Sequence, residues 1–458
     1  MTGDTIDGYL GDEAYPSNFH RQFTPQWIDA MLRHRGIAPP RRTARQPFAL
    51  LDLGCGDGLG LVAIAAAHPE GRFLGIDALP DHVARGTAFA AGLGIGNVEF
   101  RCALFADIAD PAVPDFDPDF DYVTAQGVLA WVSPANRDHL RRIAAAQLKP
   151  GGIACIGYNC MPGWAGALAF QQVVWMLAEE KQGSALQRYE AAFAQIRELS
   201  AAGASSFSAS FMAWVDNLRA TVPAAYFPHE YLNRHWQPLW SSDVHADLTA
   251  QGLSFAGTSR SELLRPDFIL RKAQRAALAA IAGDAAREVT MDAMLGQSFH
   301  VDLFARGIAR VDEAHAARLG GWWAALKSEA NTIYEARTHA GTLRFDNPAA
   351  HAVMNALGEG PTTVAGIAAR GFEGTGADLL NAIDALWMSG QIHPCDPPGE
   401  APNAGAFNAA IRAQAVAGTA LPALVGRHGA MPVDVPAIAA VEKGEPDALA
   451  LMRRLAIV

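Results

Sequence analysis

The stretch Leu51-Asp52-Leu53-Gly54-Cys55-Gly56-Asp57-Gly58 joins an apolar run, Phe48 to Leu53, to a helical run, Gly60 to His68. Its three glycines allow the backbone to come within contact distance of a ligand, because glycine has no side chain in the way. The start of the following helix adds free N–H groups and the positive end of the helix dipole. The stretch therefore predicts a strand, a loop and a helix that together bind a nucleotide-like ligand.

Short apolar runs alternate with amphipathic runs from Pro47 to about Trp164. We expect buried strands over Phe48 to Leu53, Phe73 to Ile76, Val98 to Cys102, Tyr122 to Ala125 and Ile153 to Tyr158. We expect helices over Gly60 to His68, Pro80 to Leu93 and Pro134 to Leu148, preceded by one that Thr24-Pro25 starts and that runs to Arg35. Strand and helix in alternation imply right-handed crossovers and a parallel sheet that is covered on both faces. The fold class is therefore α/β, with a doubly wound, Rossmann-like sheet.

The strand signal stops after Trp164, and the rest of the chain divides by its patterns. Leu168 to Ala202 is amphipathic throughout, Ser242 to Gly252 has the pattern of a capped helix, and Phe299 to Arg306 alternates as a strand does. Near the end, three short helices and a strand follow in the order of a winged helix: Ala349 to Leu357, Thr363 to Arg370, Ala377 to Met388 and Gln391 to His393. We expect a ligand-binding domain over 1–165, a helical connector over 166–222, a helical and α+β domain over 223–335 and a winged-helix-like domain over 336–458.

Composition limits the class of protein. Of the 458 residues, 50% are hydrophobic and 18% are charged, and there is no run of about 20 apolar residues, so we expect a soluble chain without a membrane span. The first residues lack the basic and apolar stretches of a secretory signal, which favours the cytoplasm. The cysteines have neither disulfide nor zinc spacing, so no metal is expected; they are Cys55, Cys102, Cys155, Cys160 and Cys395.

Nucleic-acid partners are not expected. The formal net charge is −11, and phosphate backbones are bound by basic surfaces. The recognition helix and entry loop of the expected winged helix, Gly371 to Cys395, contain no lysine or arginine. We therefore interpret that domain as a structural module or a protein-contact module.

The glycine spacing separates two nucleotide-binding families. A dinucleotide fingerprint needs Gly-x-Gly-x-x-Gly, whereas this chain has Gly-x-Gly-x-Gly preceded by Asp52. That pattern resembles motif I of class I methyltransferases, which implies S-adenosyl-L-methionine (SAM) as cofactor and S-adenosyl-L-homocysteine as product. Asp77 ends the second strand, where its carboxylate can accept both ribose hydroxyls. The expected cofactor-binding residues are Asp52, Gly54, Cys55, Gly56, Gly58, Asp77, Ala78, Ala103, Leu104 and Gln126.

Further stretches resemble class I methyltransferases that carry a methyltransferase regulatory domain, a family whose members include rickettsial-type protein lysine methyltransferases. The resemblance places the regulatory domain at 223–335. The family commonly has His where this chain has Gln126, and Tyr-Ser where it has Leu129-Ala130. The matching stretches are Gly127 to Pro134, Tyr158 to Trp164, His229 to Leu232 and Asp302 to Gly307.

Two of these stretches follow the carboxyl ends of central strands, where α/β sheets place reacting ligands. We expect Tyr158, Asn159 and Gln126 to position the methyl acceptor by hydrogen bonds, with Tyr158 nearest the chemistry. Trp131 and Trp164 either wall off water, face a cation with their π surface or simply pack. His229-Glu230 is interpreted as a helix-start pair at a domain interface rather than as a catalytic dyad.

Three functions remain open from the sequence. The resemblance favours an enzyme that methylates a protein side chain, namely lysine, and an acidic surface suits basic protein sites. The second is a small-molecule N- or O-methyltransferase whose C-terminal domains close over the pocket. The third is a SAM-binding regulatory protein with little turnover.

Overall fold

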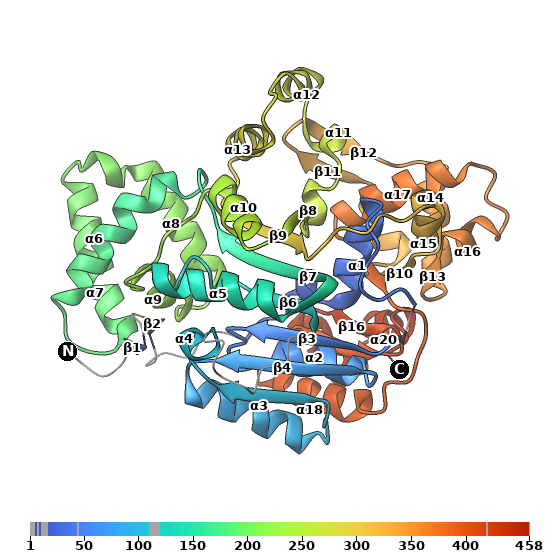
Figure 1. The fold of residues 1–458 in the computed structure, drawn as a ribbon, viewed down its shortest axis with the longest axis horizontal. Helices are drawn as coiled ribbons and strands as arrows, with labels where there is room; N and C mark the ends of the chain where they lie inside the picture. The colour runs from blue at the N-terminus through green and yellow to red at the C-terminus, as the bar shows by residue number, and fades with distance from the viewer. Residues whose placement is uncertain are drawn as a thin grey trace.

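A seven-stranded sheet forms the centre of the molecule (Figure 1). The structure is a computed structural model and describes residues 5–6, 9–10, 17–43, 45–109, 120–417 and 420–457. The strand order is β5-β4-β3-β6-β7-β9-β8; the first five are parallel, and β9 runs antiparallel to both of its neighbours. The strands are β3 (Phe48–Leu53), β4 (Gly71–Asp77), β5 (Val98–Cys102), β6 (Phe120–Ala125), β7 (Leu148–Asn159), β8 (Ser254–Thr258) and β9 (Phe299–Ala305). The predicted doubly wound α/β sheet is confirmed.

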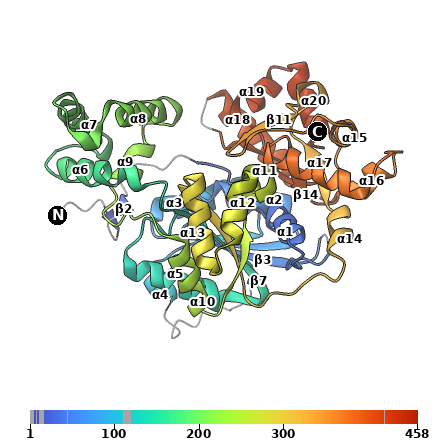
Figure 2. The ribbon, with the colours of Figure 1, turned by 90° about the horizontal axis from the view of Figure 1, so that it is seen from above.

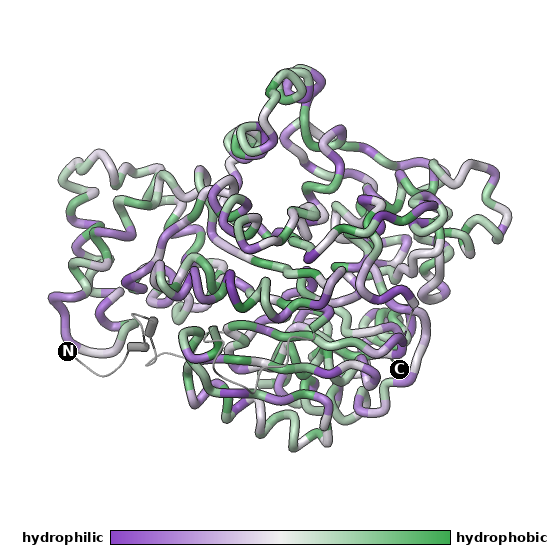
Figure 3. Tube along the Cα trace, in the orientation of Figure 1, coloured by the Kyte–Doolittle hydropathy of each residue, from purple (hydrophilic) through white to green (hydrophobic). Residues whose placement is uncertain are grey.

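Helices cover both faces of this sheet, because successive side chains of a strand point to opposite faces. In β3, Phe48 and Leu50 pack into one core, whereas Leu51 and Leu53 pack into another. The first core also contains side chains of α1 (Pro25–His34), α2 (Leu59–Ala67) and α3 (Pro80–Gly92). The second contains side chains of α4 (Phe105–Ile108), α5 (Pro134–Gln147) and α10 (Ser241–Ala250). Figure 3 shows hydrophobic stretches through the centre and hydrophilic stretches on outer loops.

The sheet does not end near residue 165, where the sequence predicts that the first domain ends. Strands β8 and β9, which complete it, come from the segment 223–335 that the sequence analysis treats as a separate domain. Phe299 to Arg306 has the pattern of a strand, but β8 is a short edge strand with an irregular register between Phe255 and Gly257, so it gives no clear alternation. The segment 223–335 thus contributes two strands to the central sheet. Between β8 and β9 lie α11 (Pro266–Ile269), α12 (Lys272–Ala279) and α13 (Asp284–Leu295).

Four helices form a lobe beside the sheet, residues 168–231, which we call the helical lobe (Figure 2). The amphipathic stretch Leu168 to Ala202 forms two helices, because Gly183 has a φ of 111° and Ser184 begins the second one with a capping box. Stacked and edge-on aromatic rings fill the lobe, including Tyr189, Phe193 and Tyr231. The helices are α6 (Leu168–Glu179), α7 (Ala185–Ala201), α8 (Ala209–Thr221) and α9 (Tyr226–Tyr231).

The C-terminal part begins with α14 (Ala314–Leu319) and contains the predicted order of helices and strand. Its three-stranded sheet has the order β13-β10-β14. The middle strand, β10, precedes the three predicted helices in the chain rather than following them. The winged-helix interpretation of 336–458 therefore stays a prediction. The elements are β10 (Trp322–Ala325), β11 (Glu335–Thr338), β12 (Gly341–Arg344), α15 (Pro348–Gly358), β13 (Thr362–Thr363), α16 (Val364–Ala368), α17 (Gly376–Met388) and β14 (Ile392–Cys395).

The last segment covers α2, which explains why that helix is apolar on every side. Its sequence, Leu-Gly-Leu-Val-Ala-Ile-Ala-Ala-Ala, has no polar face, and such a helix must be buried all round. The sheet covers one side, and α18 with the β15–β16 hairpin covers the other. No helix that the structure describes is long and apolar enough to cross a membrane. The segment consists of α18 (Ala404–Val416), β15 (Ala423–Gly426), β16 (Gly429–Pro432), α19 (Val435–Glu442) and α20 (Pro446–Arg454).

Candidate active site

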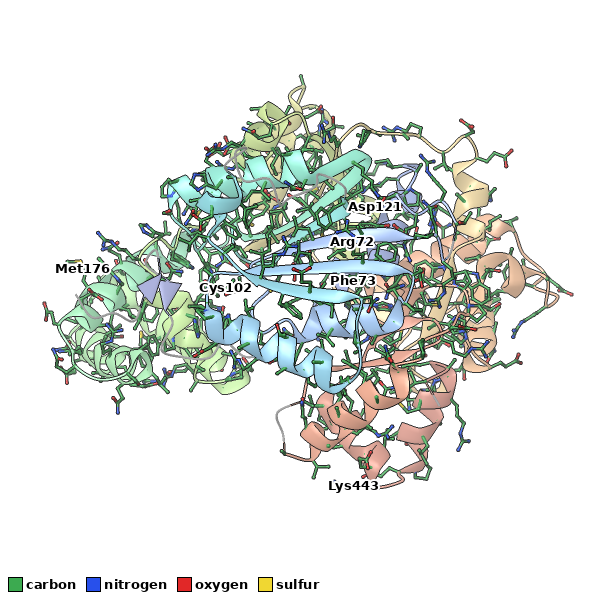
Figure 4. The ribbon with its side chains drawn as sticks, turned by 60° about the horizontal axis from the view of Figure 1, so that its bottom comes forward. Arg72, Phe73, Cys102, Asp121, Met176 and Lys443 are labelled. Carbon is green, nitrogen blue, oxygen red and sulfur yellow. The ribbon has the colours of Figure 1, made fainter. Side chains whose placement is uncertain are left out.

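A cavity of about 550 Å³ lies at the carboxyl edge of the parallel strands. In Figure 4, Cys102 at the end of β5 lies on the side of the sheet that faces the helical lobe, where Met176 is labelled. Loops after β3 to β7 line the cavity, together with the N-terminal segment 17–23 and side chains of α9. This is the edge where parallel α/β sheets bind ligands. Nearly all predicted site residues line it: Asp52, Gly54, Cys55, Gly56, Asp77, Ala78, Ala103, Leu104, Gln126, Trp131 and Asn159.

The three glycines after β3 all have positive φ, at 74°, 58° and 70°, but they do different things. A Cβ on Gly54 would lie 2.4 Å from Val128, and one on Gly58 would lie 2.2 Å from Phe100. A Cβ on Gly56 would meet no protein atom within 4 Å. Gly54 and Gly58 thus make room for neighbouring side chains, whereas Gly56 presents bare backbone to the cavity. Gly58 makes room for Phe100 and does not line the cavity, and its contact with the cofactor stays a prediction.

Backbone N–H groups of the two neighbouring loops hold the carboxylate of Asp77 at the end of β4. One carboxylate oxygen accepts from the backbone N–H of Gly56 at 2.9 Å. The other accepts from the N–H of Leu79 at 2.9 Å and contacts Nδ1 of His82 at 3.2 Å. A carboxylate has about four lone-pair sites, so at least one on the first oxygen stays open to a ligand in the cavity.

Asp52, at the end of β3, is a second carboxylate in the cavity wall. Burial raises its pKa to about 6, a hydrogen bond from the Thr124 hydroxyl at 2.7 Å opposes this rise, and the charge of Asp77 adds to it. Burial raises the pKa of the Cys55 thiol well above the usual value, and the charges of Asp52 and Asp77 raise it further. The neutral thiol leaves both carboxylates free to attract a cationic ligand.

Glu230 belongs to the candidate site, although the sequence analysis interprets it as part of a helix-start pair at a domain interface. It lies in α9, at the interface between the helical lobe and the sheet, and it lines the cavity at 2% exposure. Its carboxylate accepts from Asn159 Nδ2 and Trp236 Nε1, both at 2.6 Å, and from the Tyr226 hydroxyl at 3.2 Å. Burial raises its pKa to about 7 against the effect of these three donors.

His20 was also missed, because it lies before the first predicted helix in a segment without a motif. Its ring lines the cavity, and its Nδ1 lies 3.5 Å from Nε2 of Gln126. Burial lowers its pKa to about 4, so the ring is neutral at physiological pH. The structure therefore places an imidazole beside the position where the resembling family commonly has histidine.

Tyr158 does not lie where the sequence analysis expects it. It is fully buried, does not line the cavity, donates a hydrogen bond at 2.7 Å to Asp302 and stacks on the ring of His300. Adjacent residues of a strand point to opposite faces, and in β7 it is Asn159 that faces the cavity. The predicted catalytic role of Tyr158 is therefore corrected to a structural one.

We expect Tyr158→Phe to lower stability and to spare the methyl transfer. The substitution removes one donor from a buried carboxylate, which costs about 1–3 kcal/mol. Thermal unfolding should show a lower melting temperature, while turnover at a temperature well below it stays close to the wild-type value. A variant of unchanged melting temperature and strongly reduced turnover would restore the catalytic assignment.

Comparisons with known proteins agree with this geometry. Residues 50–152 match the family model of a methyltransferase domain, and residues 223–306 match that of a predicted methyltransferase regulatory domain. PKMT2 from Rickettsia typhi in complex with AdoHcy superposes with a TM-score of 0.68 over 93% of this chain and 87% of that chain, at 17% identity. This similarity concerns the fold.

Two further proteins are similar to this chain in amino-acid sequence. An uncharacterized protein of Synechocystis is 24% identical over 78% of this chain and 70% of its own length. An uncharacterized protein of Rickettsia prowazekii is 29% identical over 48% of this chain and 84% of its own. Residues 50–152 therefore form a methyltransferase domain and residues 223–306 a methyltransferase regulatory domain, and the glycine loop and the sheet order agree with a SAM-dependent methyltransferase.

Proposed function

We propose that this methyltransferase transfers the methyl group of SAM to the side-chain nitrogen of lysine in a protein. The observation that carries the proposal is a buried carboxylate, Glu230, in the wall of the cavity beside Asn159, with hydrogen-bond donors but no cationic partner among the described residues. Trp131 and Trp164 line the same cavity, and indole rings attract cations. A carboxylate and aromatic rings suit an acceptor that arrives as an ammonium ion.

We assign the two ends of the cavity from the strand order. The loops after β3, β4 and β5 would hold SAM: Asp77 and Ala78 at the ribose, Ala103 and Leu104 along the adenine, and Asp52 near the methionine ammonium. Bare backbone at Gly56 and a cavity of about 550 Å³ fit a ligand of this size. Bound there, SAM supplies an activated methyl group on a sulfonium.

The acceptor end would then lie at β6, β7 and α9, on the other side of β3. Gln126 and Trp131 lie in the loop after β6, Asn159 is the last residue of β7, and Glu230 lies in α9. Methyl transfer is an in-line displacement, so the site must align the acceptor nitrogen and keep it neutral. The net charge of −11 favours approach of a basic protein surface, and the fold of PKMT2 fits the same interpretation.

SAM affinity should fall as the pH falls through about 6, the pKa of Asp52. The ionised carboxylate attracts the methionine ammonium, and protonation removes this attraction, so we expect binding weaker by up to about tenfold at about pH 5 than at about pH 7. Calorimetric titrations at the two pH values check this. Asp52→Asn should bind more weakly with little pH dependence; an equal pH dependence in that variant would assign the effect to another group.

Transfer of labelled methyl groups tests the proposed acceptor class. The enzyme is incubated with methyl-labelled SAM and an extract of its own cells, which is then separated into protein, nucleic acid and small molecules. We expect the label in protein. Label in small molecules would instead support the metabolite methyltransferase, and label in nucleic acid would contradict the proposal.

A further inference from the structure

We infer that Glu230 is the general base of the reaction: its carboxylate takes the proton from the acceptor ammonium, and Asn159 and Trp236 hold it in place to do so. This inference rests on the proposed amine acceptor and goes further, because it assigns the proton transfer to one atom. That atom is Oε2 of Glu230.

The hydrogen bonds around Glu230 leave this oxygen open. Oε1 accepts the two short bonds, from Asn159 Nδ2 and Trp236 Nε1, which fill its two lone-pair sites. From the residues that the structure describes, Oε2 accepts a single, longer bond at 3.2 Å, from Tyr226. The carboxylate is therefore fixed through one oxygen and has an unused lone pair on the other. Because Asn159, Tyr226 and Glu230 all line the cavity, a ligand in the cavity can reach this group.

Within the described part of the chain, no cationic side chain pairs with Glu230. No ion pair among the described residues involves Glu230, and neither lysine nor arginine contributes to its pKa. A buried carboxylate without a cation is unfavourable unless another group neutralises it. An acceptor ammonium would do so on binding, and handing over its proton would leave two neutral groups in a desolvated site.

The proton transfer makes the acceptor nitrogen a nucleophile. The ammonium gives one proton to Oε2, which leaves a neutral amine and a carboxylic acid. The freed lone pair of nitrogen then forms the C–N bond with the methyl carbon, while the S–C bond breaks and its electron pair stays on sulfur. The products are a methylated ammonium, a neutral thioether and the proton on Glu230, which passes to water when the site opens.

The other titratable groups around Glu230 and in the cavity are less suited to this role. Burial lowers the pKa of His20 to about 4, so its ring is too weak a base to hold a proton near neutral pH. Burial raises the pKa of Tyr231, the next residue along α9, and Tyr226 donates its hydroxyl proton to Glu230. Asp52 belongs to β3, at the end of the cavity assigned to the cofactor. With a pKa raised to about 7 by burial, Glu230 is matched to general-base catalysis at physiological pH.

Glu230→Gln tests the inference, with Glu198→Gln as the matched control. Glutamine keeps the shape and an oxygen that accepts from Asn159 and Trp236, but it cannot take a proton. Glu198 is exposed on α7 of the same lobe, away from the cavity. We expect the Glu230 variant to lose about 100-fold or more in turnover with extract protein as acceptor, and to lack the rise of kcat/KM through about pH 7 that we expect of the wild type. The control should behave as the wild type.

Two measurements without turnover separate catalysis from folding. The folded-state pKa of Glu230 lies above the unfolded value, so ionisation of this group costs stability as the pH rises through about 7. Glu230→Gln should therefore gain melting temperature relative to wild type at about pH 8 more than at about pH 5. SAM affinity should be unchanged by calorimetry, which shows an intact cofactor site.

The outcomes distinguish this inference from the proposed function. If the wild type forms methyllysine and Glu230→Gln keeps wild-type turnover and pH profile, the general-base assignment is overturned and the proposed function stands. If the wild type labels no amine, the proposed function fails, and the inference fails with it. Loss of turnover and of the pH-dependent rise, with cofactor affinity intact, supports both.

Discussion

Replacing Asp302 by alanine should lower the free energy of unfolding by about 3–5 kcal/mol, because it removes the shared partner of a buried charge network. The carboxylate accepts from the Tyr158 hydroxyl at 2.7 Å and contacts ring nitrogens of His245 at 3.0 Å and His300 at 3.2 Å. Asp302 is in β9, Tyr158 in β7 and His245 in α10. One side chain therefore joins the methyltransferase strands to the regulatory segment.

The charged groups of this network stabilise one another. Burial raises the pKa of Asp302, but the charge of His300 and the hydrogen bonds from His245 and His300 outweigh it and lower the pKa overall. Burial lowers the pKa of His300, and the carboxylates of Asp302 and Asp292 raise it well above the usual value. Ligand atoms of Glu288, Asp292 and His300 lie within 4.8 Å of one another. Because Nε2 of His300 already contacts Asp292 at 2.9 Å, we interpret this group as part of the network.

Urea unfolding at neutral pH measures the Asp302→Ala effect. Asp284→Ala is the matched control, because Asp284 is 95% exposed on nearby α13 and pairs with Arg287. An exposed ion pair is worth less than about 1 kcal/mol, so the control should unfold like the wild type. Equal urea midpoints for the two variants would show that the network contributes little to the stability of the contact between β7, β9 and α10.

Asp77→Ala should weaken SAM binding by about 1.5–3 kcal/mol, the usual range for hydrogen bonds to a charged group. The substitution removes two contributions to SAM binding. The proposed bonds to the ribose are lost, and so is the bond that holds the Gly56 N–H at 2.9 Å and keeps the glycine loop against β4. The affinity should therefore fall by about 10- to 150-fold, while the sheet stays folded.

Isothermal titration of SAM into the Asp77→Ala protein measures this loss. Asp81→Ala is the control, since Asp81 is an exposed carboxylate four residues further along, in the first turn of α3. Its affinity should match that of the wild type. Unchanged affinity in Asp77→Ala would remove the ribose assignment and leave Asp77 with its structural bond alone.

The cofactor end of the site could be predicted because its residues follow consecutive parallel strands. Strand ends meet at one edge of a parallel sheet, so a glycine loop after β3 and a carboxylate after β4 are sufficient to bring Gly56 and Asp77 together. The contact between Asn159 and Glu230, in contrast, spans 71 residues and depends on how the helical lobe folds back onto the sheet. No periodicity in the sequence carries that information.

Two other differences have local causes. Tyr158 and Asn159 share one motif, but a strand turns neighbouring side chains to opposite faces, so only Asn159 reaches the cavity. β8 is short and lies at the edge of the sheet. Its Gly257 has a φ of 117°, and side-chain atoms of Arg35 pack against it. A five-residue strand with a bulge lacks the alternation from which strands are predicted.

Identifying the methylated atom in labelled protein tests the central claim most directly. Protein from the transfer reaction with methyl-labelled SAM is hydrolysed to amino acids, and the labelled amino acid is identified by chromatography and mass spectrometry. The proposed chemistry predicts methylated lysine from the wild type and about 100-fold less of it, or none, from Glu230→Gln. Label on a carboxylate, a thiol or arginine, or equal methyllysine from both proteins, would contradict it.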